Sequence, residues 1–149
     1  MSFTYEYPRP SVTVDTIILT KEKPCKILLI QRGHDPFAGS WALPGGFLNE
    51  DEPISVGAAR ELMEETGLNG VTLNQMYTFG DPGRDPRGHT VSVVHYGFVD
   101  KVIELSGQDD ASDAKWFEFN KLPSLAFDHA KILEHAKKFM VSHFPDLLS

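Results

Sequence analysis

The sequence predicts one α/β domain with a mixed sheet and helices packed against it. Apolar β-branched runs occupy both halves of the chain, one helical segment lies between them, and a second helical segment closes the sequence. Strands that precede and follow a helix in this way favour a layered α/β architecture. The 149 residues are enough for a single domain, 1–149, with its own hydrophobic core.

The predicted elements follow from runs of apolar residues bounded by Gly, Pro and charged residues. We expect strands at 12–20, 26–31, 41–43, 71–79, 90–99 and 115–119, and helices at 53–66 and 128–144. The last helix repeats an apolar face through Ile132, Leu133, Ala136, Phe139 and Met140. Its histidines, His129, His135 and His143, are expected on its surface.

The first helix has recognisable ends. Pro53 suits the first helical position, Asp51 or Glu52 is expected to cap the helix, and Gly67 is a natural stop. We expect its core face to carry Val56, Ala59 and Met63, which appear opposite a cluster of glutamates on the helical wheel.

Composition excludes several functional classes. A formal net charge of -7 argues against a nucleic-acid module, which needs a basic surface. Cys25 is the single cysteine, so no internal disulfide framework exists. The start lacks the basic and apolar segments of a secretory signal, and the longest aliphatic runs are too short to span a bilayer. We therefore expect a cytoplasmic protein without membrane contact.

Three glutamates of the first helix form the strongest chemical pattern. Glu61, Glu64 and Glu65 are three and four residues apart, so they share one face. Like charges at this spacing destabilise a helix, although many acidic runs are only solvated surface. Oxygen ligands in a row also suit Mg²⁺ or Mn²⁺, and the glycine pair Gly45-Gly46 lies just upstream.

The segment 46–68 resembles the Nudix box of the Nudix hydrolases. Gly46 is followed after five residues by Glu52, and seven residues later by Arg60-Glu61-Leu62, Glu64-Glu65 and Gly67-Leu68. The resemblance implies the Nudix fold, an α/β/α sandwich around a mixed sheet. It also implies metal-dependent hydrolysis of a nucleoside diphosphate linked to another group.

The resemblance assigns roles to residues of the box. Glu61, Glu64 and Glu65 would bind the metal together with the carbonyl of Gly45. Glu52 would support the site, and Arg60 would pair with a box carboxylate. Relatives often carry glycine where this sequence has Asp51, which affects the conformation of the loop and not the chemistry.

The general base stays open between two regions. In several relatives it lies on a loop before the last strand, and by position Asp110 is the first candidate, followed by Asp109 and Asp113. A box glutamate such as Glu64 is the alternative, and Glu61 is a further catalytic candidate.

Other segments narrow the substrate. Residues 41–47, 84–89 and 125–129 together resemble the ADP-ribose pyrophosphatase branch, which cleaves ADP-ribose to AMP and ribose 5-phosphate. Arg84, Arg87 and Arg32 are candidates to contact the diphosphate. The alternative is that Arg84 and Arg87 only pair with Asp85. Phe37 and Trp41 are candidates to stack on adenine, or else pack in the core or as a lid.

Two other functions compete with this interpretation. One is the same chemistry on NADH, a nucleotide sugar or a damaged nucleoside triphosphate. The other is a non-catalytic regulator that senses ADP-ribose, although only about 30 residues follow the last predicted strand, too few for a winged-helix domain. A homodimer is possible by analogy, with Phe3, Tyr5 and Tyr7 at its interface.

Overall fold

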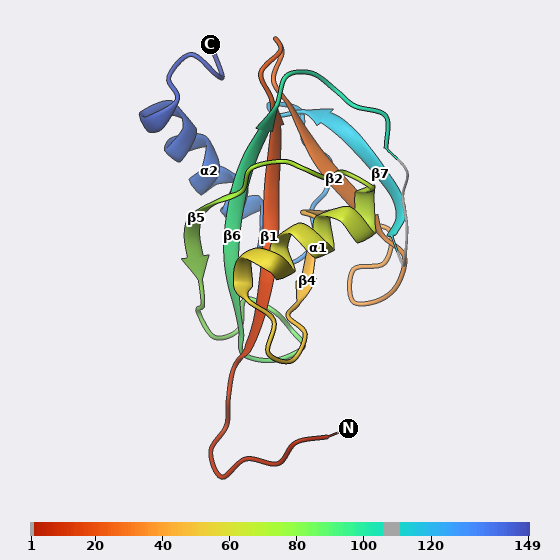
Figure 1. Ribbon diagram of the computed structural model, residues 1–149, viewed down its shortest axis with the longest axis vertical. Coiled ribbons are helices and arrows are strands. Elements are labelled where there is room, and N and C mark those ends of the chain that lie inside the picture. Colours follow the sequence, from red (N-terminus) through yellow and green to blue (C-terminus); the bar gives the residue numbers. More distant parts are fainter. Residues whose placement is uncertain (1, 106–110) are drawn as a thin grey trace.

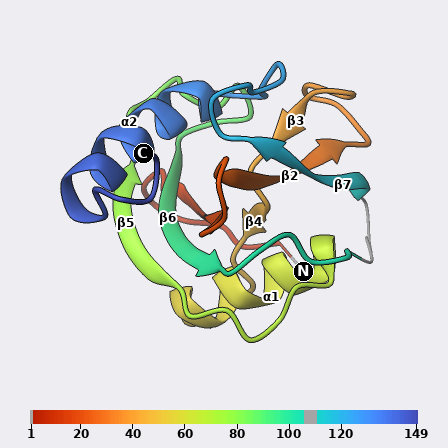
Figure 2. The same ribbon diagram turned by 90° about the horizontal axis from the view of Figure 1, so that it is seen from above.

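The computed structural model describes residues 2–105 and 111–149, and these residues form a mixed sheet between two helices. The strands are β1 (Ser11–Thr20), β2 (Lys26–Arg32), β3 (Trp41–Ala42), β4 (Gly45–Phe47), β5 (Asn74–Phe79), β6 (Thr90–Val99) and β7 (Ala111–Glu118). The helices are α1 (Ile54–Thr66) and α2 (His129–His143). Figure 2 shows α1 and α2 on opposite sides of the sheet, so the expected α/β/α layering is confirmed.

β1 lies at the centre of the sheet and organises it. The strand order over the described residues is β3-β2-β1-β6-β5, with β4 paired to β1 and β7 paired to β2. β1 and β6 run parallel through ten residue pairs, whereas the other pairings are antiparallel. Because β1 is covered on both faces, its last eight residues are all buried and do not alternate between buried and exposed.

Side chains of alternate parity on β1 build a separate core on each face of the sheet. Ile17 and Leu19 pack toward α2, where they meet Ile132, Leu133, Ala136 and Met140. Ile18 packs with Leu28 and Leu62 on the α1 side. A fully buried aliphatic side chain contributes about 1.5–3 kcal/mol, so these two cores hold the helices firmly in place.

α1 differs from the sequence prediction at its start and on its faces. The helix begins at Ile54, with Pro53 extended before it, and no side chain of Asp51 or Glu52 caps it. Its buried residues are Gly57, Ala58, Leu62 and Thr66. The expected core face was wrong, because Val56, Ala59 and Met63 are exposed.

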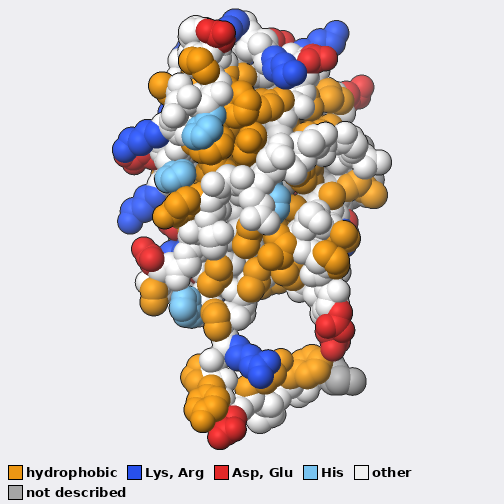
Figure 3. Space-filling view, turned by 60° about the vertical axis from the view of Figure 1, so that its left-hand side comes forward, with side chains coloured by type: hydrophobic (Ala, Val, Ile, Leu, Met, Phe, Trp, Pro, Cys, Tyr) orange, Lys and Arg blue, Asp and Glu red, His pale blue; other side chains and the backbone are white. Residues whose placement is uncertain are grey.

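α2 confirms its predicted apolar face, but His129 is buried and does not lie on the helix surface as expected. At the other end of the chain, residues 2–10 form an arm that projects from the body (Figures 1 and 3). Phe3, Tyr5 and Tyr7 are exposed along this arm. None of the helices within the described residues has the length and apolar character needed to cross a bilayer.

Candidate active site

A cavity of about 370 Å³ opens where β1, β4, α1, the 80–89 loop and the start of α2 meet. This volume lies in the range of small-molecule sites. The three box glutamates and the glycine pair form one wall. The same cavity is also lined by basic and aromatic residues, including Arg32, Arg84, Arg87, Phe127 and His129, together with the acids Asp15 and Asp85. The cavity therefore combines acidic and basic side chains.

Arg60 organises the glutamates of the box. Its Nε and Nη2 donate to Glu52 at 2.7 and 2.9 Å, and its Nη1 donates to Glu61 at 2.8 Å and Glu64 at 3.1 Å. Nη2 also donates to the carbonyl of Phe47 at 3.2 Å, which ties the loop to the helix. The hydrogen bonds that Glu52 accepts from Arg60 lower the pKa of Glu52 to about 2, so this carboxylate stays ionised.

Glu65 and Glu61 are held beside the glycine pair. Glu65 accepts the N–H of Gly45 at 2.7 Å. Burial raises the pKa of Glu65 to about 8, and the charges of Glu61 and Asp15 act in the same direction. Burial also raises the pKa of Glu61. Burial outweighs the lowering effect of Arg60 on Glu61 and of Arg32 on Glu65, and a bound cation would favour the ionised form of both carboxylates.

Each glycine of the pair makes room for a carboxylate. A Cβ on Gly46 would lie 2.7 Å from Cδ and Oε1 of Glu61. A Cβ on Gly45 would overlap the backbone oxygen of Val14 and the carboxylate of Asp15. The pairing of β4 with β1 sets this close approach, because Asp15 lies opposite Gly45 and Val14 opposite Gly46. At Gly45 the obstacle includes backbone, so only glycine fits there, whereas at Gly46 the Glu61 side chain would have to move.

The donor set suits a hard divalent cation completed by other ligands. Within the described ranges, no three His, Cys, Asp or Glu side chains converge closely enough to enclose an ion alone. Mg²⁺ is usually held by one or two carboxylates, with waters and substrate oxygens completing its shell. Glu61 and Glu65, at the cavity wall beside Gly45, fit that requirement.

The loop of the box between β4 and α1 adopts a left-handed conformation at Asp51. Its φ is 58°, a conformation that non-glycine residues adopt infrequently, although Asp is among the residues that tolerate it. The departure from glycine at this position therefore leaves the loop conformation accessible. The N–H of Asn49 donates to Glu52 at 3.0 Å, and this hydrogen bond closes the turn around Asp51.

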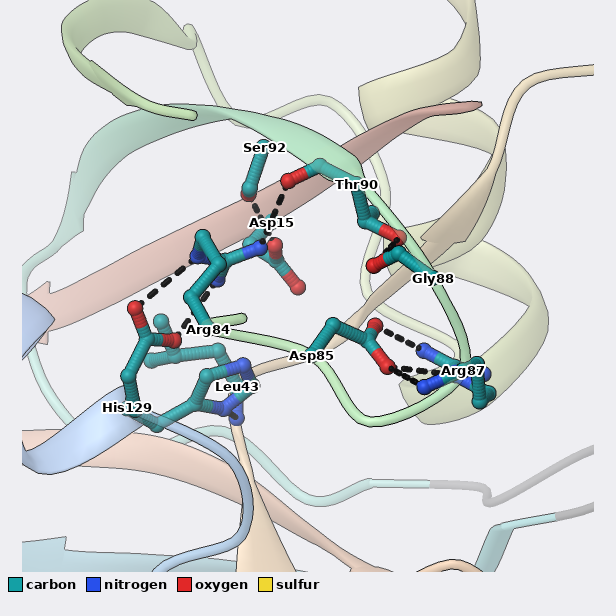
Figure 4. Close-up of polar contacts among 10 residues, drawn as sticks. Asp15, Leu43, Arg84, Asp85, Arg87, Gly88, Thr90, Ser92 and His129 are labelled. Atoms are coloured by element: carbon teal, nitrogen blue, oxygen red, sulfur yellow. Dashed lines mark hydrogen bonds and ion pairs between the residues drawn. The ribbon is translucent and has the colours of Figure 1, made fainter. Parts of the chain in front are cut away.

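Two of the three arginines expected to contact the substrate, Arg84 and Arg87, are paired with aspartates. Arg84 is largely buried and donates from Nε and Nη2 to Asp128 at 2.9 and 2.7 Å, with Nη1 reaching the carbonyl of Thr90 at 3.3 Å (Figure 4). Arg87 donates to Asp85 at 3.1 and 2.8 Å. Although burial opposes it, these bonds hold the pKa of Asp85 below its usual value.

Arg32 has the most available guanidinium of the three. Its Nε donates to the carbonyl of Pro36 at 2.7 Å, and its Nη2 is buried with no hydrogen-bond partner among the described residues. Burial lowers the pKa of Arg32, and the positive charge of Arg87 acts in the same direction. An unpaired buried donor is costly, and an anionic ligand in this cavity would satisfy it.

Phe37 and Trp41 are not among the described residues that line the cavity. Trp41 packs edge-on against Phe117 with ring centroids 4.8 Å apart. Phe37 packs against Phe127 at 4.9 Å, and Phe127 does line the cavity. Adenine stacking by Phe37 or Trp41 stays a prediction.

The candidate bases differ in how they are placed. Glu64 lines the cavity, whereas Asp113 pairs with Lys115 at 3.6 Å and is not among the described lining residues. Asp109 and Asp110 lie outside the described residues.

Sequence reasoning gave no individual role at the site to Asp15, Phe127 or His129, all of which line this cavity. Asp15 is a buried carboxylate that accepts the hydroxyl of Ser92 (Figure 4). His129 accepts the N–H of Leu43 on Nδ1 at 3.0 Å, so its proton sits on Nε2, and burial lowers its pKa. Phe127 is the third. The resemblance of 125–129 to the ADP-ribose pyrophosphatase branch covered Phe127 and His129 without giving either a role, and the signal for Asp15 was an acid among the apolar residues of β1.

Comparison with known proteins decides the family. A family model described as the NUDIX domain matches residues 9–136, most of the chain. The chain belongs to the Nudix family. The sequence prediction of Nudix membership and of the Nudix fold is thus confirmed.

Three relatives illustrate this membership. The chain is 47% identical over 130 residues to an ADP-ribose pyrophosphatase of Methanocaldococcus jannaschii, covering 86% of this chain and 73% of that protein. It is 35% identical to an ADPR responsive transcriptional repressor NtrR of Acinetobacter baylyi, covering 88% of this chain but 54% of the repressor. The NUDIX domain of Shewanella oneidensis NrtR, complexed with ADP ribose, superposes with a TM-score of 0.84 at 33% identity, covering 90% of each chain.

Proposed function

We propose that this Nudix protein is a pyrophosphohydrolase that uses Mg²⁺, or Mn²⁺ in its place, to cleave ADP-ribose into AMP and ribose 5-phosphate. The observation that carries the proposal is the cavity in which Glu61 and Glu65 face Arg32 and Arg87. A diphosphate needs cationic partners on both sides, and this cavity offers arginines on one and a cation-binding wall on the other. The similarity to an ADP-ribose pyrophosphatase and to an ADP ribose complex supports the choice of substrate.

The side chains of this protein divide the work. Glu61 and Glu65, with the carbonyl of Gly45, would hold the cation, which when bound supplies charge neutralisation and a more acidic water. Arg32 and Arg87 bind the phosphate oxygens of the substrate. Arg60 and Glu52 keep the loop and the helix in register, so that the carboxylates stay aligned.

Glu64 is the base that we propose for the attacking water. It lines the cavity, and it forms an ion pair with Arg60 at 3.1 Å. Asp110 is the competing candidate, and variants separate the two. Glu64→Gln should lower kcat strongly, whereas Asp110→Asn should leave it within about threefold, since a lost general base costs on the order of 10²–10⁴-fold. The opposite pattern would transfer the role to Asp110.

Hydrolysis of ADP-ribose in ¹⁸O-labelled water with Mg²⁺ tests the function. We expect AMP and ribose 5-phosphate, with the label in one product only, which identifies the attacked phosphorus. A parallel series of NADH, nucleotide sugars and oxidised nucleoside triphosphates tests the substrate. If ADP-ribose is cleaved no faster than these, the substrate assignment is wrong although the family is not.

Regulation by ADP-ribose binding is the second candidate, favoured by the 35% identity to an ADPR responsive repressor. The net charge of -7 and the intact set of box glutamates count against it. Tight, salt-dependent binding to duplex DNA, without hydrolysis of ADP-ribose, would favour the regulator.

We further propose that the protein acts in the cytoplasm and forms a homodimer. The single buried cysteine suits a reducing compartment. The exposed aromatic side chains of the arm at 2–10 offer apolar surface to a second copy. Light scattering of the full chain, with and without residues 2–8, tests the dimer: loss of the dimer on truncation supports the arm, and a monomeric full chain refutes the proposal.

A further inference from the structure

Phe127 contacts two arginines that line the cavity together with the box glutamates. The guanidinium carbon of Arg32 is 4.8 Å from the centroid of its ring, and that of Arg87 is 4.9 Å away. Arg32 comes from the end of β2 and Arg87 from the 80–89 loop, so the ring is the shared contact of two separate segments. Cations are attracted to an aromatic face, and the ring therefore offsets their mutual repulsion.

The backbone at Phe127 is held in a conformation that bulky residues rarely adopt. Its φ is 52°, in the left-handed region. Contacts on both sides fix it there: Ala126 donates its N–H to the carbonyl of Trp41 at 2.8 Å, and Asp128 accepts two bonds from Arg84. His129 accepts the N–H of Leu43. A strained residue held by so many neighbours is typical of a site where geometry matters.

The turn at 126–129 connects to two other segments that line the cavity. Asp128 holds the 80–89 loop through Arg84, and His129 holds the segment between β3 and β4 through Leu43 (Figure 4). Phe127 contacts the guanidiniums of Arg87 and Arg32. That of Arg87 also donates to Asp85, whereas Nη2 of Arg32 has no hydrogen-bond partner in the described structure. Both guanidiniums are thus held at the same ring, and only that of Arg87 is paired with a carboxylate, Asp85.

We infer that Phe127 is a positioning residue that spaces Arg32 and Arg87 to bind the two phosphate groups of one substrate together. The inference rests on the proposed function for the identity of the ligand as a nucleoside diphosphate. Phe127 does not take part in the chemistry; it acts through the two arginines. Ligands with two phosphate groups should therefore depend on the ring more than ligands with one.

The test compares ADP and AMP as competitive inhibitors of ADP-ribose cleavage. Phe127→Leu keeps apolar bulk without the aromatic face, Phe127→Tyr keeps the face, and Phe127→Gly removes the side chain at a φ that glycine adopts freely. Phe139→Leu, on α2 and away from the cavity lining described above, is the matched control. Thermal unfolding of each variant accompanies the kinetics.

For the Leu and Gly variants we expect the inhibition constant of ADP to rise about tenfold and that of AMP by less than about threefold, roughly the loss of one good charged contact. KM for ADP-ribose should rise in parallel with ADP, while kcat changes little. Phe127→Tyr and Phe139→Leu should resemble the unmodified protein. A Leu variant that fails to fold leaves the Gly variant to decide.

Two outcomes would overturn the inference. Equal weakening of ADP and AMP would mean that the ring contacts the nucleoside that both share. Unchanged constants in both the Leu and Gly variants would mean that the ring positions nothing. If the unmodified protein does not cleave ADP-ribose, the proposed function fails, but direct titration of ADP and AMP against the same variants still tests the spacing of the arginines.

Discussion

Substituting alanine at Gly46 should lower kcat/KM for ADP-ribose about 100-fold while the fold survives. The added Cβ would lie 2.7 Å from the carboxyl carbon of Glu61, whereas two carbons in ordinary contact are about 3.5–4.0 Å apart. The carboxylate must therefore retreat by roughly 1 Å, since it is the far end of a flexible side chain and Gly46 is not in the left-handed region. A 1 Å misplacement in an active site costs on the order of 100-fold, or about 2.7 kcal/mol of transition-state stabilisation.

Gly45→Ala is the matched comparison, because its obstacle is backbone. The added Cβ would overlap the carbonyl oxygen of Val14, and it would lie 2.9 Å from Cα of Asp15. Neither can move without disturbing the β1–β4 pairing, so we expect a loss of about 1–3 kcal/mol in the free energy of unfolding. For a chain of this size, each 1 kcal/mol lowers Tm by about 2–4 °C.

The assay measures kcat/KM for ADP-ribose at saturating Mg²⁺ alongside thermal unfolding. Gly46→Ala should lose about 100-fold in kcat/KM with Tm within a few degrees of the unmodified protein. Gly45→Ala should lower Tm clearly. A fully active Gly46→Ala protein would refute the placement of Glu61 at the reacting centre, and a Gly46→Ala protein that unfolds first would refute the distinction between the two glycines.

Three further predictions follow from the box. Glu65→Gln keeps the shape and removes one charge, so Mg²⁺ affinity and turnover should each fall at least ~10-fold in a metal titration; unchanged turnover would remove Glu65 from the ligand set. Because the pKa of Glu65 is about 8 without metal, Mg²⁺ binding at pH 7 should release protons, seen as a dependence of the calorimetric heat on buffer ionisation; no such dependence would contradict the buried carboxyl. Arg60→Ala should lower the free energy of unfolding most above pH 4.5, the ordinary pKa of Glu52, because Arg60 stabilises only the ionised form of Glu52. The loss should shrink as the pH falls toward 2, as measured by denaturation at a series of pH values. A loss that stays constant across that range would show that Arg60 acts by packing.

The residue pattern of the box and its Nudix resemblance together predicted its local structure. The helix was predicted from its residue pattern and its stop from Gly67, while the pairing of Arg60 with box carboxylates was implied by the Nudix resemblance; the structure shows all three. Local periodicity predicts the helix because neighbours on one helix turn are set by chain geometry alone. Most strands were predicted from apolar runs, but β5 begins three residues later and β7 four residues earlier than expected, and the short strand β4 was not predicted.

The faces of α1 show where periodicity failed. The glutamates were assumed to lie opposite the core, which placed Val56, Ala59 and Met63 inside. The structure instead buries Ala58, Leu62 and Thr66, immediately beside Glu61 and Glu65, because the active site lies at the edge of the α1–sheet interface. Functional polar residues can border a core, so their position does not identify the buried face.

The other wall of the cavity depends on tertiary contacts. His129 and Leu43 are 86 residues apart, and Ser92 and Asp15 are 77 apart. Arg84 was expected to contact substrate, but its guanidinium is bound by Asp128 44 residues away. Such partners cannot be inferred from spacing, since only the packing of α2 and the 80–89 loop against β1 brings them together.

Anomalous scattering from crystals soaked in Mn²⁺ tests the central claim most directly. The account predicts one or more Mn²⁺ ions beside the carboxylates of Glu61 and Glu65, within the cavity faced by Arg32 and Arg87. Soaked crystals of active protein with no ion near these glutamates, or with ions bound only elsewhere on the surface, would contradict it.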